Sequence, residues 1–288
     1  MSHAGLAVTA RGVIHLYRAE GHDVAALSGV DLAVEPGQVI ALLGPSGSGK
    51  STLVSILAGL LVPSAGVVSI GDTALHELAP RQLDRLRATQ VGIVLQGSSR
   101  NLIPALTLRA NLQFAQSAAR QHRGEVAKID RLAELVGLAG QLDRPLAQLS
   151  ATARQRAALA TAIAAGPGLI LADEPTNRLD HEARAEILAT LTDINRTTSA
   201  TIIVVTHDPQ VAGWAPRTVT IRDGRVGAEG RLGEEFAVVS LDGSLPLPAE
   251  ALRTFPPGSL VRVSASDGTW TLQPAPLDPG PDQRSAGW

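Results

Sequence analysis

The sequence lacks cysteine, an excess of either charge, and any long apolar run. Without cysteine, neither disulfides nor thiolate metal sites can form. The 25 basic and 27 acidic residues leave a net charge of -2, which gives no electrostatic reason to expect nucleic acid as a partner. No stretch approaches the roughly 18 apolar residues of a membrane span, and the first residues lack the basic region and apolar core of a signal peptide. We therefore expect a cytoplasmic protein that reaches a membrane only through a partner.

The chain of 288 residues has room for one large α/β domain and a small appendage. Strands are expected where apolar runs or apolar–polar alternation occur, at residues 6–14, 27–34, 39–43, 91–95, 169–172 and 201–205. Helices are expected between them, at residues 50–58, 80–90, 151–165 and 181–195. A loop is expected at 19–26 and a small helical subdomain at about 97–150. This alternation predicts a mostly parallel sheet in a main domain that spans residues 1–229.

A glycine-rich motif follows the expected strand at 39–43. It fits the pattern GxxxxGK[ST] and consists of Gly44, Pro45, Ser46, Gly47, Ser48, Gly49, Lys50 and Ser51, with Thr52 extending it. Glycines let successive backbone N–H groups face a phosphate, and the helix that begins at Lys50 adds the positive end of its dipole. Lys50 is expected to reach the β- and γ-phosphates, and the Ser51 hydroxyl to coordinate Mg²⁺. The motif therefore predicts that ATP binds here with Mg²⁺.

Two adjacent carboxylates, Asp173 and Glu174, follow the apolar strand 169–172. In open α/β sheets this end of a strand is where ligands bind. Asp173 suits a Mg²⁺-associated carboxylate, with water between the two, and Glu174 suits the general base that polarises the attacking water. The alternative interpretation is a solvated turn, which the neighbouring phosphate-binding motif disfavours.

Residues 149–153, which read Leu-Ser-Ala-Thr-Ala, resemble the signature segment LSGGQ of the ATP-binding-cassette (ABC) ATPases. The resemblance extends over residues 6 to about 228 and implies a phosphate-loop ATPase fold with an antiparallel β subdomain and a helical subdomain. It assigns further roles by position. Gln96 would be the glutamine that senses the metal and water, His207 the histidine that contacts the γ-phosphate, and Tyr17 the ring that stacks on adenine. Asp180 would lie in the loop that crosses the dimer interface.

ABC ATPases bind two ATP molecules between two subunits, so the signature acts on the partner's nucleotide. The resemblance implies that Ser150 contacts ATP in trans and that Ala151 and Thr152 replace two glycines. An added Cβ where backbone approaches phosphate is expected to slow hydrolysis at sites completed by this signature. Two alternatives follow: a heterodimer in which the partner supplies an intact signature, or a regulatory subunit with little turnover.

Three stretches resemble the lipoprotein-release, macrolide-export and cell-division group of ABC ATPases: the loop before residues 24–27, the run 101–107, and ADEPTNRLD at 172–180. This resemblance implies a separate membrane permease as partner and export of lipids, lipoproteins, peptides or drugs. It places the protein peripherally on the inner face of the membrane. A non-transport ABC protein of translation or DNA repair is disfavoured, because the chain contains neither a second cassette nor a long coiled-coil insertion.

Beyond residue 229 the composition changes. Short strands are expected at 236–240, 260–264 and 269–273, which predicts a small β module over residues 230–273. Its pattern resembles swapped-hairpin domains of the AbrB type, many of which bind DNA as dimers. Three arginines against five acidic residues between 231 and 273 favour dimerisation or regulation over binding to DNA or transcriptional control. Residues 274–288 are rich in proline and glycine and are expected to be disordered.

Overall fold

The computed structural model describes residues 5–19, 22–123, 126–231, 234–239, 243–248, 250–266 and 268–274. The chain divides into two compact units, Met1–Val238 and Val239–Trp288. Among the described residues, no helix is both long enough and apolar enough to span a bilayer.

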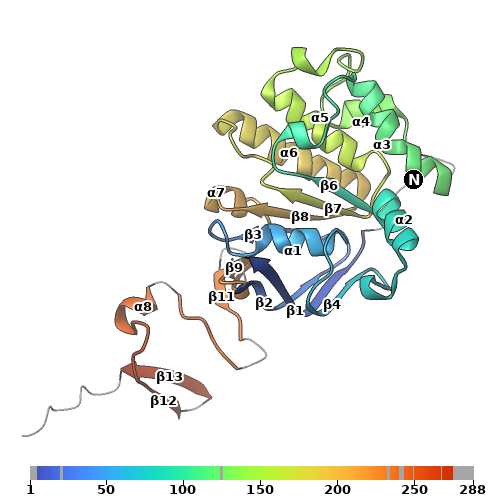
Figure 1. Ribbon diagram of the computed structural model, residues 1–288. Coiled ribbons are helices and arrows are strands. Elements are labelled where there is room, and N and C mark those ends of the chain that lie inside the picture. Colours follow the sequence, from blue (N-terminus) through green and yellow to red (C-terminus); the bar gives the residue numbers. More distant parts are fainter. Residues whose placement is uncertain are drawn as a thin grey trace, which may run out of the picture. The chain divides into compact units, whose positions relative to one another are not determined.

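A seven-stranded sheet forms the centre of the first unit, in the strand order β11-β10-β9-β3-β8-β7-β6 (Figure 1). The ladder from β6 through β7, β8 and β3 to β9 is parallel, whereas β10 and β11 continue it in antiparallel fashion. The mostly parallel α/β fold predicted from the sequence is confirmed. The strands are β3 (Val39–Leu43), β6 (Val91–Val94), β7 (Leu169–Asp173), β8 (Thr201–Thr206), β9 (Arg217–Arg222), β10 (Arg225–Arg231) and β11 (Glu234–Ala237).

A second sheet of four antiparallel strands has the order β2-β1-β4-β5. Its strands are β1 (Val8–Ala19), β2 (His22–Val34), β4 (Ala65–Ile70) and β5 (Thr73–Ala74). The prediction of a loop at 19–26 is wrong for residues 22–26. Strand β2 begins at His22, and Val24 pairs with Tyr17 of β1. Polar residues interrupt the alternation there, and the pairing with β1 overrides the weak local pattern.

The helices of the first unit are α1 (Lys50–Leu57), α2 (Pro80–Gln90), α3 (Leu108–Arg123), α4 (Ile129–Leu135), α5 (Ala151–Ile163), α6 (His181–Thr198) and α7 (Pro209–Ala212), with short 3₁₀ turns η1 (Leu75–Glu77), η2 (Ser98–Arg100) and η3 (Leu146–Gln148). Between residues 97 and 150, where a helical subdomain was expected, lie η2, α3, α4 and η3. Ser150 caps α5, since its hydroxyl accepts a hydrogen bond from the Ala153 N–H at 3.1 Å.

Strands β7 and β8 are buried on both faces, which explains their unbroken apolar sequence. Leu171 and Ile203 face a core formed with α1 and the antiparallel sheet. Ile170 and Ile202 face a second core formed with helices α3 to α6. Figure 1 shows the helix α1 between the two sheets and the larger helices across the central sheet. The parallel register brings the carboxyl ends of β3, β7 and β8 to one edge.

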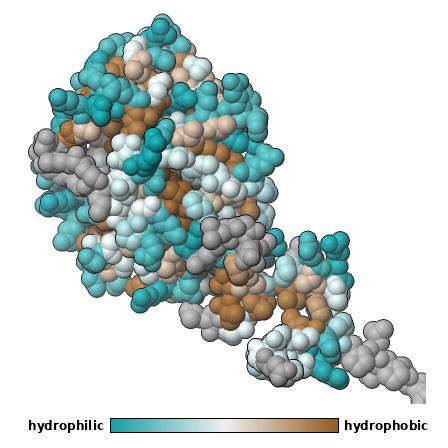
Figure 2. All heavy atoms as spheres, turned by 180° about the vertical axis from the view of Figure 1, so that it is seen from behind, coloured by the Kyte–Doolittle hydropathy of each residue, from teal (hydrophilic) through white to brown (hydrophobic). Residues whose placement is uncertain are grey.

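The second unit contains α8 (Ala251–Thr254) and a hairpin of β12 (Val261–Ser266) and β13 (Thr269–Pro274). Hydrophobic side chains lie at its surface (Figure 2), and none of its described residues is buried. The division between the units lies later than the boundary expected after residue 229, because β11 pairs with β10 in the central sheet. Residues 275–288, most of the tail expected to be disordered, lie outside the described residues.

Candidate nucleotide-binding site

The phosphate-binding motif forms a tight loop between β3 and α1, and two of its glycines are required by close approach. A Cβ at Gly44 would lie 2.2 Å from the carbonyl oxygen of Ile221. Gly49 has a φ of +96°, and a Cβ there would lie 2.2 Å from the carbonyl oxygen of Ala26. Any larger residue would therefore push the loop away from the neighbouring backbone.

Lys50 is the buried cation of this loop. Its Nζ donates hydrogen bonds to the carbonyl oxygens of Gly44 at 2.8 Å and Pro45 at 2.7 Å. Burial lowers the pKa of Lys50, while Glu174 and Asp173 act in the opposite direction. The ammonium group is thus held at the floor of the loop, beside the two carboxylates.

Asp173 ends β7 in a desolvated position next to the loop. Burial raises the pKa of Asp173 above its ordinary value, and the nearby Ser51 hydroxyl offsets this in part. The Asp173 Oδ1 atom is buried and has no hydrogen-bond partner within the described part of the chain. An unpaired buried carboxylate oxygen beside a hydroxyl suits a hard cation and its water ligands.

Glu174 and His207 form the contact between the ends of β7 and β8. The Glu174 Oε1 and His207 Nδ1 atoms are 2.7 Å apart. Glu174 has a φ of +48°, uncommon for a residue other than glycine, and its N–H donates to the Val205 carbonyl oxygen at 2.9 Å. Backbone and imidazole together fix the direction of this carboxylate.

Lys50, Glu174 and His207 line one cavity of about 800 Å³. Tyr17 lies at its rim, 42% exposed, with its hydroxyl 3.3 Å from the Thr52 Oγ1. The ring of His15 meets Tyr17 edge-on, with ring centroids 4.7 Å apart. The full lining is Tyr17, Val24, Ala25, Ala26, Pro45, Ser46, Gly47, Gly49, Lys50, Ser51, Thr52, Gln96, Glu174 and His207.

Gln96 is held in the cavity wall by a clasp that the sequence did not predict. The Asn101 side-chain amide accepts from the Leu95 N–H at 2.7 Å and donates to the Leu95 carbonyl at 2.8 Å. It also donates to the Gly97 carbonyl at 2.9 Å. These bonds secure the backbone on both sides of Gln96. In the sequence, Asn101 appeared only as part of the run 101–107 that resembles the family. No local pattern indicated that its side chain binds the backbone on both sides of Gln96.

Ser150 and Asp180 do not line this cavity. Each is the N-cap of a helix: Ser150 of α5, and Asp180 of α6, where its carboxylate accepts from the Ala183 N–H at 2.8 Å. The backbone at Ala151 and Thr152 is helical and outside the positive-φ region, so it does not need glycine's dihedral freedom. Any effect of these replacements must come from the added side-chain atoms.

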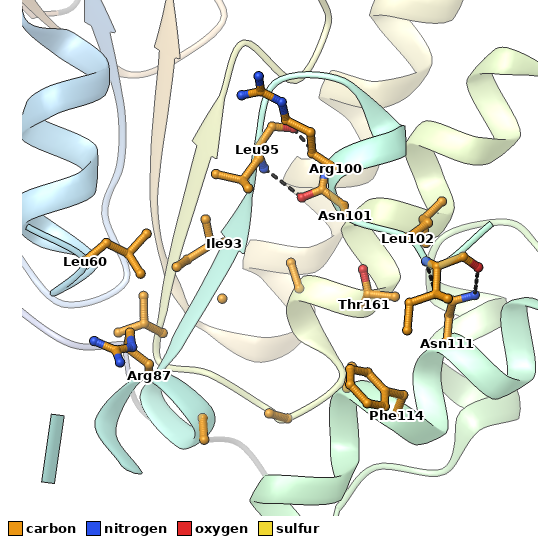
Figure 3. A pocket seen from close by; sticks show the side chains of 17 residues that line it. Leu60, Arg87, Ile93, Leu95, Arg100, Asn101, Leu102, Asn111, Phe114 and Thr161 are labelled. Atoms are coloured by element: carbon orange, nitrogen blue, oxygen red, sulfur yellow. Dashed lines mark hydrogen bonds between the residues drawn. The ribbon is translucent and has the colours of Figure 1, made fainter. Parts of the chain in front are cut away.

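A second hollow of about 520 Å³ lies on the other side of the Gln96 loop. Figure 3 shows it between β6, α2, α3 and α5, with Ile93, Thr161 and Phe114 around it and Asn101 bonded to Leu95 at one end. Phe114 is 65% exposed and Leu60 is 52% exposed. The hollow is therefore an apolar groove joined to the nucleotide cavity through one short loop.

The family model for ABC transporters matches residues 27–177, more than half of the chain. The chain belongs to the ABC transporter family. Its relatives include the lipoprotein-releasing system ATP-binding protein LolD 1 of Caulobacter vibrioides, which is 37% identical over 224 residues, 76% of this chain and 94% of that protein. The macrolide export ATP-binding/permease protein MacB of Rhodopirellula baltica is 39% identical over 218 residues. That match covers 75% of this ABC ATPase but only 32% of MacB.

Among solved structures, this ABC ATPase is similar to a dimeric ATP-binding cassette in a post-hydrolysis state bound to ADP and Pi, with a TM-score of 0.70 and 32% identity. That match covers 78% of this chain and 98% of the other. The family, the fold and the ATPase activity predicted from the sequence are thereby confirmed. The structure also adds to the cavity three residues that the sequence did not single out, Val24, Ala25 and Ala26. They entered the sequence analysis only as part of a family-like stretch.

Proposed function

We propose that this chain is the ATP-hydrolysing subunit of an exporter and drives a separate membrane permease. The observation that carries the proposal is the convergence of Lys50, Glu174 and His207 on one cavity, with Ser51 in its wall and Asp173 beside it. A buried cation at a phosphate loop, a hydroxyl and a carboxylate that can hold Mg²⁺, and a second carboxylate that can orient water are recurring parts of phosphoryl-transfer sites.

ATP is proposed to enter with its adenine on Tyr17 and its phosphates in the loop. The half-exposed Tyr17 ring offers a stacking face, worth about 1–3 kcal/mol by analogy with base stacking. Lys50 exchanges its contacts with the Gly44 and Pro45 carbonyls for phosphate oxygens. The N–H groups of the loop and the N-terminus of α1 face the same phosphates.

Ser51, Gln96 and Asp173 are proposed to hold Mg²⁺, with Asp173 acting through water. The unpaired Asp173 Oδ1 and the adjacent Ser51 hydroxyl fit this ion. Mg²⁺ neutralises charge on the β- and γ-phosphate oxygens when bound. Asn101 keeps Gln96 in reach by fixing the backbone around it.

Glu174 is proposed as the general base that takes a proton from the attacking water, a role worth about 10²–10⁴-fold in rate. His207, bonded to Glu174 at 2.7 Å, keeps the carboxylate directed into the cavity and contacts the γ-phosphate. Lys50 stabilises the charge that develops on the transferred group.

A second cassette is proposed to complete each site. Ser150 and Asp180 lie outside the chain's own cavity, at helix N-termini where N–H groups favour an anion. The dimeric state of the related cassettes supports their action on a partner's nucleotide. The partner is a second copy or a different ABC subunit.

The apolar groove beside the Gln96 loop is proposed as the contact for the permease, which would hold the chain peripherally on the cytoplasmic face of the membrane. Exposed Phe114 and Leu60 supply the apolar surface, and the loop links the groove to the metal site. Relatives named for lipoprotein release and macrolide export support export of lipids, lipoproteins, peptides or drugs.

The test is affinity purification of the tagged chain from membranes. We expect a multi-span permease to co-purify with wild-type protein and with Ser117→Asp, and to be lost with Phe114→Asp. Ser117 lies on the same helix but outside the groove lining. Equal recovery of membrane protein with both variants would refute the groove assignment.

A second candidate function is a nucleotide-gated regulatory subunit with little turnover. It is motivated by Ala151 and Thr152, which stand where the family signature has glycines. Tight ATP binding without phosphate release, even in the complete assembly, would favour it.

We also propose that the small β module expected over residues 230–273 is of the swapped-hairpin type and is used for dimerisation or regulation; its hairpin of β12 and β13 lies after Val238. Acidic residues outnumber basic ones in this part of the sequence, so nucleic acid is not an expected partner. The domain assignment is then a cassette, this module and a disordered end.

A further inference from the structure

The hairpin of β12 and β13 is amphipathic. Its cross-strand pairs alternate between two faces. One face carries only apolar pairs, Val261 with Pro274, Val263 with Leu272 and Ala265 with Trp270. The other face carries polar pairs, Arg262 with Gln273, Ser264 with Thr271 and Ser266 with Thr269. A strict alternation of this kind is typical of a sheet with one face meant to be covered.

Nothing in the described part of the second unit covers the apolar face. Trp270 is 73% exposed and Val263 is 54% exposed. All described residues of the hairpin are exposed, and none of the residues that the structure describes in this unit is buried. A two-stranded hairpin is marginal in water on its own, and exposed apolar patches on soluble proteins mark interaction surfaces. The described part of this unit therefore presents an apolar face without the second layer that would bury it.

We propose that the apolar face of the β12–β13 hairpin, which we call the hairpin face, packs against the same face of a second copy of this chain. Two identical apolar faces related by a two-fold axis bury each other without requiring any new complementary surface. Charge does not oppose the pairing, because no member of the hairpin face is ionisable, whereas Arg262 lies on the polar side.

The size of the face also favours a tethered copy over an independent partner. Six residues per chain make less than the roughly 800 Å² per partner of a standard interface. The hairpin contact alone is therefore expected to be weak and reversible. Pairing of the cassettes, on which this step of the inference rests, strengthens it by holding two hairpins at a high effective concentration. By reciprocity the hairpin contact keeps two cassettes together after ATP has been hydrolysed.

The first test measures self-association of the nucleotide-free full chain by sedimentation and light scattering. We expect a reversible equilibrium between the 29.8 kDa chain and its dimer. Val263→Lys with Leu272→Lys should raise the dissociation constant at least about tenfold, because two charges would be buried in each face. The matched control, Ser264→Lys with Thr271→Lys, adds the same charges to the polar side of the same strands and should leave it unchanged. Equal behaviour of the two double variants, or a wild-type chain that stays monomeric, would overturn the proposal.

The second test uses the absence of cysteine in the chain. In Ala265→Cys the single thiol lies on the hairpin face, and in Ser264→Cys it lies on the polar side. We expect the maleimide reaction of Ala265→Cys to slow at least about tenfold as protein concentration rises, and that of Ser264→Cys to stay constant. Slow reaction at every dilution would mean that the chain's own cassette covers the face. Fast reaction at every concentration would indicate that the hairpin face is free in this chain and is covered by a different protein. Either result contradicts self-pairing.

These measurements do not depend on ATP, so they can succeed even if the ATPase assignment fails. Conversely, phosphate release by the Val263→Lys, Leu272→Lys chain at saturating ATP reports on the cassette alone. Its retention together with lost self-association would separate the two proposals.

Discussion

The Nδ1 atom of His207 lies 2.7 Å from Oε1 of Glu174, a contact set by the register of two parallel strands. Asp173 pairs with Val205 across β7 and β8, so the residues that follow these positions emerge at the same sheet edge. The Glu174 N–H donates a hydrogen bond to the Val205 carbonyl oxygen, which fixes the backbone of Glu174 at this edge. The acid and the imidazole are therefore placed by the sheet itself.

Loss of either member of this pair should slow hydrolysis without preventing ATP binding. We expect Glu174→Gln and His207→Ala each to lower kcat by about 10²–10⁴-fold, because a proton acceptor or its orientation is removed. Nucleotide affinity should change little, since Lys50 and the loop are intact. Steady-state phosphate release and equilibrium binding of a fluorescent ATP analogue measure the two effects. Normal turnover in Glu174→Gln would rule out this base.

Asn101→Ala should lower kcat by about 10–100-fold, because the backbone around Gln96 loses its clasp and small displacements at a reacting centre cost that much. ATP affinity without Mg²⁺ should be unchanged, whereas the Mg²⁺ concentration needed for half-maximal rate should rise. Asn111→Ala is the matched control, since Asn111 makes similar bonds to Ile103 and Thr107 away from the cavity. Its variant should lose stability but keep its Mg²⁺ dependence, and an identical Mg²⁺ response in both would contradict the role.

Asp173 should make nucleotide binding depend on pH. Burial raises the pKa of Asp173, so protons compete with Mg²⁺ at a higher pH than they do at an exposed aspartate. We expect Mg²⁺-dependent ATP affinity to fall as the pH is lowered through this raised pKa. Titration of binding at several pH values, with and without Mg²⁺, checks it.

The same shift has a consequence for stability. A carboxyl with a raised pKa in the folded chain favours folding below its unfolded pKa, and this contribution is lost as pH rises through the folded pKa. Asp173→Asn should therefore raise the melting temperature of the nucleotide-free chain at neutral pH while it abolishes the stabilisation by Mg²⁺-ATP. A lower melting temperature in the variant would contradict the desolvation argument.

Restoring glycines to the signature should raise turnover. Ala151→Gly with Thr152→Gly removes side-chain atoms at the N-terminus of α5, where, in the proposed dimer, the backbone approaches the partner's phosphate. We expect kcat of the purified assembly to rise by up to about tenfold, less than the loss of a whole preorganised donor, because the helical backbone is already in place. An unchanged rate would show that the family tolerates these residues.

The predictable part of the site lay in contiguous sequence. Residues 44–52 match a glycine-rich phosphate-binding pattern, and an apolar run before Asp173 indicates a buried strand. Both patterns lie within a few consecutive residues, so the sequence alone predicts a loop at 44–52 and a strand that ends just before Asp173. The contact between His207 and Glu174 could be placed only by a resemblance, because it depends on which strands are neighbours in the sheet. The Asn101 clasp left no local signal, since an asparagine that binds backbone looks like any other loop residue.

Two differences between the expected and the observed fold have similar causes. Residues 22–26 read as a loop, yet pairing with β1 makes them strand. The boundary expected after residue 229 falls before β11, because β11 is only four residues long and carries little local signal, yet it pairs with β10 at the edge of the central sheet. In both places the structure is determined by pairing with a neighbouring strand. Such pairing is not visible in a short stretch of sequence.

Hydrolysis of ATP in this cavity can be measured as Mg²⁺-dependent release of phosphate. The purified assembly should release phosphate from ATP, and Lys50→Ala should abolish this release together with ATP binding, because the loop loses its buried cation. Phosphate release that persists at the wild-type rate in Lys50→Ala, or ATP binding that does not need Lys50, would show that this cavity is not the site of hydrolysis.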